Sequence, residues 1–574
     1  MRNLMRQLTN RLPIVVFFLG LSLASQPVLG DQIEAFDVLD VMYEELQRSF
    51  QALQEQDQPP YYISYEVTQD KTLSVSGSYG EISFASDTSF RVLDIDLRVG
   101  SYDLDNTHFG DFGGGSTSIS IESPRAIRNT LWYATNTRYR NAVTRLSNVV
   151  SAMQSRVEEV DKSGDFAPAP QEEFRAEIVE LQADKALFEA KVKRYGLPFK
   201  RAEHIISNQV SIGGDVETRW FVNSDGTKVQ VSEPYYRIVI SASSKAEDGM
   251  ILPRYMTYAS STVEGLPEDA IILQDIENMI ESLEQLREAP LVDPYTGPAI
   301  LSGRAAGVFF HEILGHRLEG HRQKAEHEGQ TFKAKLGEYV LPENFSVSFD
   351  PNMRTFGSTE LIGSYNYDNQ GVRGQRVVVV EDGILTGFLM SRLPMKGFLS
   401  SNGHGRKNFG LPVVARQSNM FVEVEDPYSP EELQELLLVR VREQGKEFGL
   451  YFDDIQGGFT ITQRTLPNAF TVTPIVVYRL YTDGHKELVR GVNLIGTPLT
   501  TFSRVEAGGS DYGIFNGMCG AESGQIPVSA VAPSILVSQI EVQKATSSRG
   551  RPPILSNPVE NSSETSFHLP STEP

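Results

Sequence analysis

The chain has 574 residues, and 74 aspartates and glutamates against 52 lysines and arginines give it a formal net charge of −22 at pH 7. This acidic balance argues against nucleic acid and anionic membrane surfaces as partners. The single cysteine, Cys519, permits no internal disulfide. The fold must therefore be stabilised by its core, and a chain of this length can bury the cores of two domains.

The first 30 residues are typical of a secretory signal. Arg2, Arg6 and Arg11 form a basic start, and a ten-residue apolar run follows at 14–23. Ten residues are too few to span a bilayer, so an uncleaved anchor is only the alternative. We therefore expect residues 1–30 to be removed from a periplasmic or secreted protein that has no stable membrane anchor. Its net charge would be −25, because this segment holds three arginines and no acidic residue.

Residues 31–295 are expected to form an N-terminal domain of helices and antiparallel strands within an α+β fold. Apolar residues at helical spacing predict an amphipathic helix at 31–55, and alternation predicts strands at 61–99. The further elements expected are helices at 124–160, 171–195 and 267–287, and strands at 204–244 with a hairpin turn at 224–226. The two long charged helices could form an inter-subunit arm or a solvated hairpin. Nothing in this domain looks catalytic, so we expect it to serve assembly and closure of the site.

A linker at 290–298 is expected to lead into a C-terminal β-rich, barrel-like domain at 296–545 that carries a metal-binding helix near its start. Frequent glycines suit the bulges and corners of a closed or strongly curved sheet. The strands expected are 376–380, 384–390, 421–424, 459–463, 470–480 and 535–542. The tail at 546–574 is rich in Ser, Pro, Thr and Asn, and its composition predicts disorder.

Two histidines and a carboxylate lie close together at His311, Glu312 and His316, in a chain with nine histidines. The apolar segment at 305–314 predicts a buried helix, in which these polar side chains need partners such as a metal ion. Zinc-binding helices usually space their histidines at i and i+4. Here the spacing is i and i+5, which on a regular helix leaves the imidazoles about 140° apart and separated by about 7.5 Å of rise. They could converge only if the helix widens or ends, and we predict that distortion at Leu314–Gly315.

A catalytic zinc usually has three protein ligands and one water, so a third ligand is needed. Cys519 lies in a glycine-dense segment at 513–525, which we expect to be a loop that lets backbone approach an ion. Competing candidates are Glu319, His321, His327 and His404. The alternative is that Cys519 is a small buried hydrophobe and that His311 and His316 are hydrogen-bonded core residues.

Three motifs carry a resemblance to a known family: HEILGH at 311–316, RTLPNAF at 464–470 and MCGAESGQIPVS at 518–529. Together they resemble the TldD/PmbA family of zinc metalloproteases, and the similarity extends over most of the chain. The resemblance implies one Zn²⁺ per chain, with His311, His316 and Cys519 as ligands and Glu312 as catalytic base. The partner-type member of that family lacks the histidine motif, so this chain resembles the active type.

The function expected is hydrolysis of peptides or unfolded polypeptides by metal-activated water, with a glutamate as general base. The resemblance also implies a homodimer or a heterodimer with a TldE/PmbA-type relative. An extended peptide could bind by adding to a sheet edge, helped by residues 365–373 and 401–408. Two alternatives are a non-catalytic metal-binding assembly subunit of a protease complex and a metal-dependent hydrolase of a non-peptide substrate.

Overall fold

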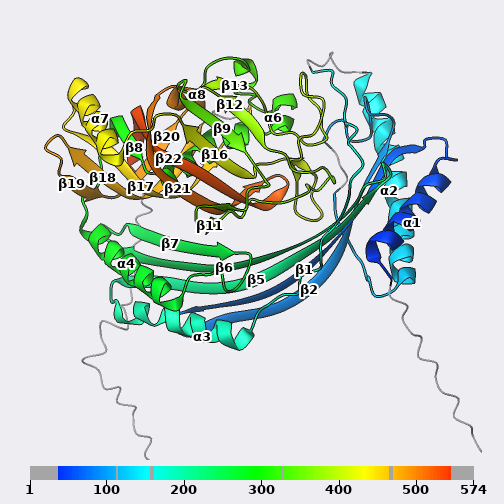
Figure 1. Cartoon of the computed structure of the whole chain (residues 1–574), viewed down its shortest axis with the longest axis horizontal. Coiled ribbons are helices and arrows are strands. Elements are labelled where there is room, and N and C mark those ends of the chain that lie inside the picture. The colour runs from blue at the N-terminus through cyan, green and yellow to red at the C-terminus, as the bar shows by residue number, and fades with distance from the viewer. Residues whose placement is uncertain (1–35, 111–113, 155–160, 326, 465–468, 545–574) are drawn as a thin grey trace, which may run out of the picture. The chain divides into compact units, whose positions relative to one another are not determined.

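The computed structural model describes residues 36–110, 114–154, 161–325, 327–464 and 469–544 (Figure 1). The expected signal at 1–30 and the tail at 546–574 lie outside these residues, so both stay predictions. Among the described residues, no helix combines the length and the apolar character that crossing a membrane requires. The described residues from Asp37 onward belong to one compact unit.

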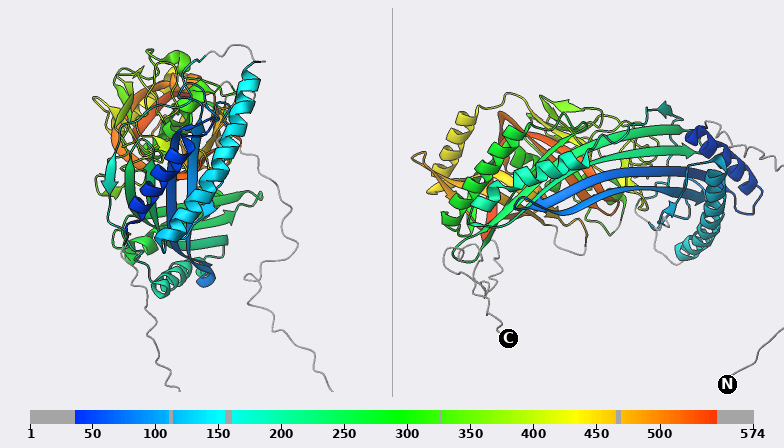
Figure 2. Two further views of the ribbon diagram at one scale, coloured as in Figure 1. Left: turned by 90° about the vertical axis from the view of Figure 1, so that its right-hand side faces the viewer. Right: turned by 90° about the horizontal axis from the view of Figure 1, so that it is seen from below.

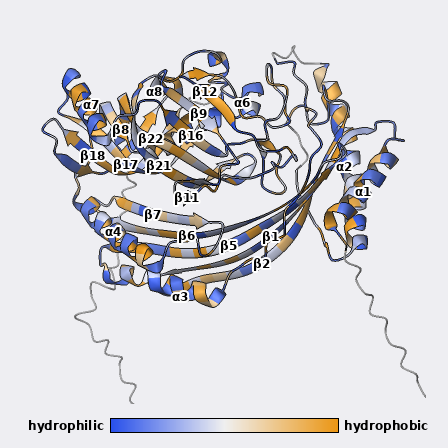
Figure 3. Cartoon of the chain, viewed as in Figure 1, coloured by the Kyte–Doolittle hydropathy of each residue, from blue (hydrophilic) through white to orange (hydrophobic). Residues whose placement is uncertain are grey.

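A seven-stranded sheet, built mainly from long antiparallel strands, forms the first half of this unit (Figure 1). Its strands are β1 (Pro60–Ser78), β2 (Glu81–Val99), β3 (Thr117–Ser118), β4 (Glu173–Arg175), β5 (Ile205–Asn223), β6 (Lys228–Lys245) and β7 (Ile251–Ser260). Orange and blue alternate along these strands in Figure 3, as expected for a sheet whose two faces differ in polarity. The strands and turns expected at 61–99 and 204–244 are confirmed.

Helices cover one face of this sheet. The helices are α1 (Val38–Leu53), α2 (Pro124–Met153), α3 (Lys185–Gly196), the 3₁₀ turn η1 (Pro198–Arg201) and α4 (Asp269–Glu288). Helices α3 and α4 share a core with apolar residues such as Ile212 of β5 and Ile238 of β6. Helices α1 and α2 pack against each other at the other end of the strands (Figure 2). The opposite face of β5 and β6 is free of these helices, and it carries polar side chains as well as a small apolar cluster around Phe221 and Val229.

The helix expected at 171–195 is wrong in its first half. The expected pair of two long helices is therefore wrong as well. Residues Glu173–Arg175 form β4, which pairs in parallel with β6, and α3 begins only at Lys185. The Asp184 side chain caps α3 by accepting from the backbone N–H groups of Ala186 and Leu187. Pairing with a distant strand therefore overrides the local helical pattern before this cap.

An eleven-stranded sheet forms the second half. Its strands are β8 (Tyr295–Leu301), β9 (Phe345–Phe349), β12 (Val377–Glu381), β13 (Ile384–Leu385), β16 (Asn419–Val424), β17 (Phe448–Thr460), β18 (Phe470–Tyr481), β19 (Lys486–Val489), β20 (Val492–Gly496), β21 (Val505–Ala521) and β22 (Gly524–Lys544). The path from β22 through β20, β18 and β17 to β8 closes on itself, because β8 also pairs with β22. The expected α+β class with a barrel-like C-terminal part is confirmed.

Short elements complete the second half. They are α5 (Gly303–Ile313), η2 (Gly315–Arg317), α6 (Gly320–Lys324), η3 (Lys333–Lys335), β10 (Thr355–Phe356), β11 (Thr359–Glu360), β14 (Gly405–Arg406), β15 (Val414–Ala415), α7 (Pro430–Glu443) and α8 (Pro498–Phe502). The first sheet ends with β7 and the second begins with β8, so the end of the expected linker at 290–298 is a strand. The limits of the two domains stay a prediction.

Helix α5 lies very close to β21 and β22. A Cβ atom on Gly303 would collide with the backbone N of Gly513, and one on Gly513 would collide with the backbone of Arg304. These two glycines thus permit a backbone approach that a side chain would prevent. The apolar side chains of α5, including Phe309 and Phe310, are buried in the core of the second half. This contact sets the distance between the helix and the strand that holds Cys519.

Carboxylates lie in a row across the face of the first sheet that the helices leave free. Asp70 of β1 is directly opposite Glu217 of β5, which in turn is opposite Glu233 of β6. All three line a cavity of about 790 Å³. Burial raises the pKa of Glu217 to about 7, which Arg219 partly opposes and the neighbouring carboxylates reinforce. This side chain is thus costly to ionise in the folded protein.

We expect Glu217→Gln to stabilise the protein at about pH 8 and to change nothing at about pH 4. The pKa of Glu217 is higher in the folded than in the unfolded state. The free energy of unfolding therefore falls as the pH rises from the unfolded-state pKa to the folded-state pKa of about 7. The gain at the higher pH should be about 1–2 kcal/mol, after discounting the shift for partial exposure. Urea unfolding at both pH values measures it, with the exposed Glu435→Gln on α7 as control. An equal gain at both pH values would contradict the prediction.

Candidate metal centre

Helix α5, which carries His311, ends before His316, as is needed for the two imidazoles to converge. Helix α5 ends at Ile313, and η2 at Gly315–Arg317 continues as a 3₁₀ turn that holds His316. A Cβ atom on Gly315 would collide with the side chain of Gln417, which donates from Nε2 to the backbone carbonyl of His311 at 3.3 Å. The predicted distortion at Leu314–Gly315 is thus observed as a helix end.

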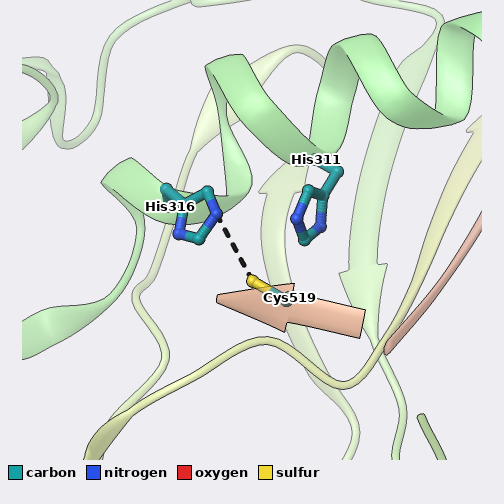
Figure 4. Close-up of side chains that lie close together, drawn as sticks. All are labelled: His311, His316 and Cys519. Atoms are coloured by element: carbon teal, nitrogen blue, oxygen red, sulfur yellow. Dashed lines mark hydrogen bonds between the residues drawn. The ribbon is translucent and has the colours of Figure 1, made fainter. Parts of the chain in front are cut away.

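The structure brings His311, His316 and Cys519 together (Figure 4). Their ligand atoms all lie within 4.8 Å of one another. The Cys519 sulfur is 3.4 Å from His316 Nε2, and the two imidazole centroids are 5.0 Å apart. All three side chains are buried. Two imidazoles and one thiolate form a donor set that fits zinc, so these residues could hold that ion.

Cys519 lies on a strand, so the expected loop at 513–525 is wrong. Strand β21 runs to Ala521, and Cys519 pairs with Ile526 of β22 close to the end of the hairpin. Glycines weaken a strand, but in this strand they also permit the close approach of α5 at Gly513. The sulfur is therefore placed by a paired strand rather than by a loop.

At Cys519 and His316, burial and neighbouring charges shift the side-chain pKa in opposite directions. Burial alone would raise the pKa of the Cys519 thiol, but His316 and His311 hold that pKa well below its usual value. Burial alone would lower the pKa of His316, but Cys519 and Glu319 hold it well above its usual value. This direction favours the thiolate form of the sulfur, which is the form that binds metals.

The competing candidates contribute no ligand atom to the cluster. Glu319 lies behind His316, with Oε1 3.4 Å from its Nδ1. His321 Nε2 lies 2.5 Å from Glu522, and the side chain of His327 is 77% exposed. His404 contacts Ser418 and Asn402, and burial lowers its pKa to about 3. Glu319 is the candidate that touches a member of the cluster, as an orienting partner of its ring.

The cluster lies at the wall of a cavity of about 820 Å³. Glu312, which is 8% exposed, lines the same cavity. Strand β17 passes close to it, because a Cβ atom on Gly458 would lie 2.5 Å from Glu312 Cγ and 2.9 Å from Cδ. A carboxylate, a possible metal site and room for a large ligand are therefore together in one place.

The first sheet also lines this cavity, which sequence reasoning missed. Tyr235 and Arg237 of β6, and Tyr255 and Thr257 of β7, face it. The alternation along β6 was the available signal, since Tyr235 and Arg237 alternate with the buried Tyr236 and Ile238. Residues 365–369 and 406–408, from the two regions suspected of helping to bind substrate, line the neighbouring 790 Å³ cavity instead. The two cavities share Tyr235, Arg237 and Met518 as lining residues.

Residues His404 and Arg406, from the region 401–408 suspected of helping to bind substrate, are buried. Arg406 donates from Nη1 to the backbone carbonyls of Gln417 and Pro527, at 2.8 and 2.9 Å. Both side chains are thus occupied in holding neighbouring segments together.

Known proteins match both the sequence and the fold. Residues 294–544 match the PmbA/TldA metallopeptidase C-terminal domain. A metalloprotease of Methanothermobacter thermautotrophicus is 25% identical over 58% of this chain and 69% of its own length. A metalloprotease of Methanocaldococcus jannaschii is 32% identical over 40% of this chain, and a zinc metalloprotease TldD homolog of Saccharolobus solfataricus is 26% identical over 43%. The chain spans about half the length of these last two relatives, 47% and 51%.

Solved structures share the fold at low identity. TldE from Thermococcus kodakarensis has a TM-score of 0.58 at 13% identity and covers 88% of this chain and 100% of its own. A protein from Thermotoga maritima described as a putative modulator of a DNA gyrase has a TM-score of 0.59 at 15% identity, over 87% of this chain and 99% of its own. The matched C-terminal domain and the metalloproteases among the sequence relatives support a metallopeptidase-type function for this chain. Over residues 294–544 the chain matches the TldD/PmbA family.

Proposed function

We propose that the protein is a zinc-dependent peptidase that hydrolyses peptides or unfolded polypeptides. One zinc ion per chain would be held by His311, His316 and Cys519. The observation that carries the proposal is the set of three buried donors within 4.8 Å of one another, beside a large cavity that Glu312 also lines. A zinc ion bound there would supply Lewis acidity, both to a water molecule and to a substrate carbonyl.

Glu312 is proposed as the general base. It precedes the end of α5 by one residue and follows the ligand His311, so its backbone is fixed by the same buried helix. Its carboxylate would take a proton from the attacking water and pass that proton to the leaving amine. The low exposure of Glu312 and of the three donors strengthens the effect of each polar group there.

Strand β7 is proposed to bind the substrate backbone. It pairs with β6 and has no other partner among the strands described here, and its Tyr255 and Thr257 line the cavity. An extended peptide that pairs with a strand edge is held by main-chain hydrogen bonds, which tolerate many sequences. Such binding would suit peptides and unfolded polypeptides, because only a chain without structure of its own is free to extend along a strand edge.

Assembly and location are proposals that follow from the sequence. We propose export, on the basis of the signal at 1–30, and a homodimer or a heterodimer with a TldE-type relative. Among the known proteins, TldE shares the fold of this chain. Size measurement of the purified protein alone, and after mixing with a TldE-type relative from the same cell, tests the assembly.

Zinc content and peptide hydrolysis, measured on the same samples, test the proposed function. About one zinc per chain together with cleavage of unstructured peptides is the expected result. Bound zinc with no hydrolysis of peptides, esters or sugar-linked substrates would identify an assembly subunit. Hydrolysis of a non-peptide substrate alone would identify a different hydrolase.

Gly458 provides a test of the placement of Glu312. We expect Gly458→Ala to lower kcat by about 10²-fold, because its new methyl group would displace the carboxylate of Glu312. The neighbouring Gly457→Ala is the matched control, since a Cβ atom there meets nothing within 4 Å. Zinc content should be unchanged in both variants. Equal loss of activity in the two variants would show that β17 itself, and not the Glu312 contact, is disturbed.

A further inference from the structure

Arg416 is a fully buried arginine that donates hydrogen bonds to the β21–β22 hairpin, which carries Cys519. Its Nη2 donates to the backbone carbonyl of Cys519 at 2.8 Å and lies 3.2 Å from the sulfur of the same residue. Its Nη1 donates to Ser523 Oγ at 2.7 Å and to the backbone carbonyl of Gly524 at 3.1 Å. One guanidinium thus holds the end of β21, the turn and the start of β22.

The same guanidinium is connected to the histidine side of the cluster. Arg416 Nε lies 3.5 Å from Glu319 Oε1, and that oxygen lies 3.4 Å from His316 Nδ1. Glu319 is fully buried, and its other oxygen accepts from Arg322 Nε at 2.7 Å. Buried charges are found almost only where they are paired. Arg416 and Arg322 together provide this pairing for the buried carboxylate of Glu319.

We propose that Arg416 is a positioning residue of the metal centre. It fixes the Cys519 sulfur opposite the two imidazoles and donates a hydrogen bond to that sulfur, while its partner Glu319 orients His316 through Nδ1. His316 then presents Nε2 to the metal, as in other sites where a carboxylate holds a ligating histidine. The inference rests on the proposed metal site and is independent of any peptidase turnover.

The chemistry of the side chain explains why arginine is required. Its planar fork reaches acceptors on both strands of the hairpin at once, whereas a lysine ammonium places its three donors at one point. Arg416→Lys therefore keeps the charge and loses the fork. Arg392 offers a matched control, because it is also fully buried but donates to the carbonyl of Ala167 and to Asp225, outside the metal centre.

The experiment loads the full chain with Zn²⁺ and, separately, with Co²⁺. We expect Arg416→Lys to weaken Zn²⁺ binding by about 10–100-fold in competition with a chelator. We also expect the sulfur-to-cobalt charge-transfer band to move to longer wavelength, because a sulfur without the hydrogen bond gives up electron density more readily. Arg392→Lys should retain the affinity and the band of the wild type.

A second variant covers the case in which Arg416→Lys does not fold. Ser523→Ala keeps Arg416 and removes one acceptor of Nη1, so the same changes should appear at smaller size. An unchanged affinity and band in the Arg416 or Ser523 variant would overturn the inference, and so would an equal loss in Arg392→Lys. If the wild type binds neither Zn²⁺ nor Co²⁺, the proposed metal site falls and this inference with it. Wild-type metal binding without peptide hydrolysis would count against the peptidase alone.

Discussion

Glu312→Gln is expected to lower kcat for peptide hydrolysis by about 10²–10⁴-fold while the protein keeps its zinc. The amide has nearly the shape of the carboxylate but cannot take a proton from water. Glu312 is separate from the three donors of the cluster, so metal content should not depend on it. Initial rates on an unstructured peptide, together with elemental analysis of the same samples, measure both effects.

The matched control for this variant is Glu328→Gln. Glu328 is also buried at the wall of the 820 Å³ cavity, but it is paired with Arg322 at 3.3 Å. This control should keep most of the wild-type rate. A wild-type rate in Glu312→Gln would remove Glu312 from the role of base. Loss of zinc in that variant would instead make Glu312 part of the metal site.

Cys519→Ala and His316→Ala are each expected to reduce the zinc content from about one per chain to nearly none, with loss of hydrolysis. Removal of either residue leaves only two of the three metal donors. Loss of Cys519 also removes the negative charge of the thiolate, which neutral imidazoles cannot supply. Both residues are buried, so solvent cannot easily replace the missing ligand. Elemental analysis after dialysis against a weak chelator measures the change.

His404→Ala is the control for these two variants. It removes another buried histidine, one whose ring contacts Asn402 and Ser418 and not the cluster. The variant should retain zinc even if its stability falls. If Cys519→Ala keeps its zinc under the same dialysis, the sulfur is not a ligand and the site must be reassigned.

Local patterns were sufficient to predict many elements. The apolar spacing of α1 and α4, the Asp225–Gly226 turn between β5 and β6 and the break at Gly315 all depend on residues that are neighbours in the sequence. The histidine motif could be recognised for the same reason. Its unusual spacing predicted the end of the helix before any tertiary contact was known.

Other features depended on residues far apart in the sequence. Residues 173–175 pair with β6, so a stretch with a helical pattern became a strand. Cys519 was expected in a loop because its glycines suggested one, but pairing with β22 and contact with α5 keep it in a strand. For the residues of β6 and β7 that line the cavity, the local signal was the alternation along β6, which by itself does not distinguish a binding face from a solvent-exposed face.

The sequence by itself predicted the resemblance to the TldD/PmbA family, the α+β class, the helix end beside His316 and the three residues of the candidate metal site. Only the tertiary structure decided that Cys519 meets His316 at 3.4 Å, that Glu319 stands behind the ring and that Arg416 grips the cysteine hairpin. The reason is physical. Backbone propensity and side-chain spacing act over a few residues. The contacts of Cys519 with His316 and with Arg416 instead depend on strand pairing and helix packing, because they join residues about two hundred and about a hundred positions apart.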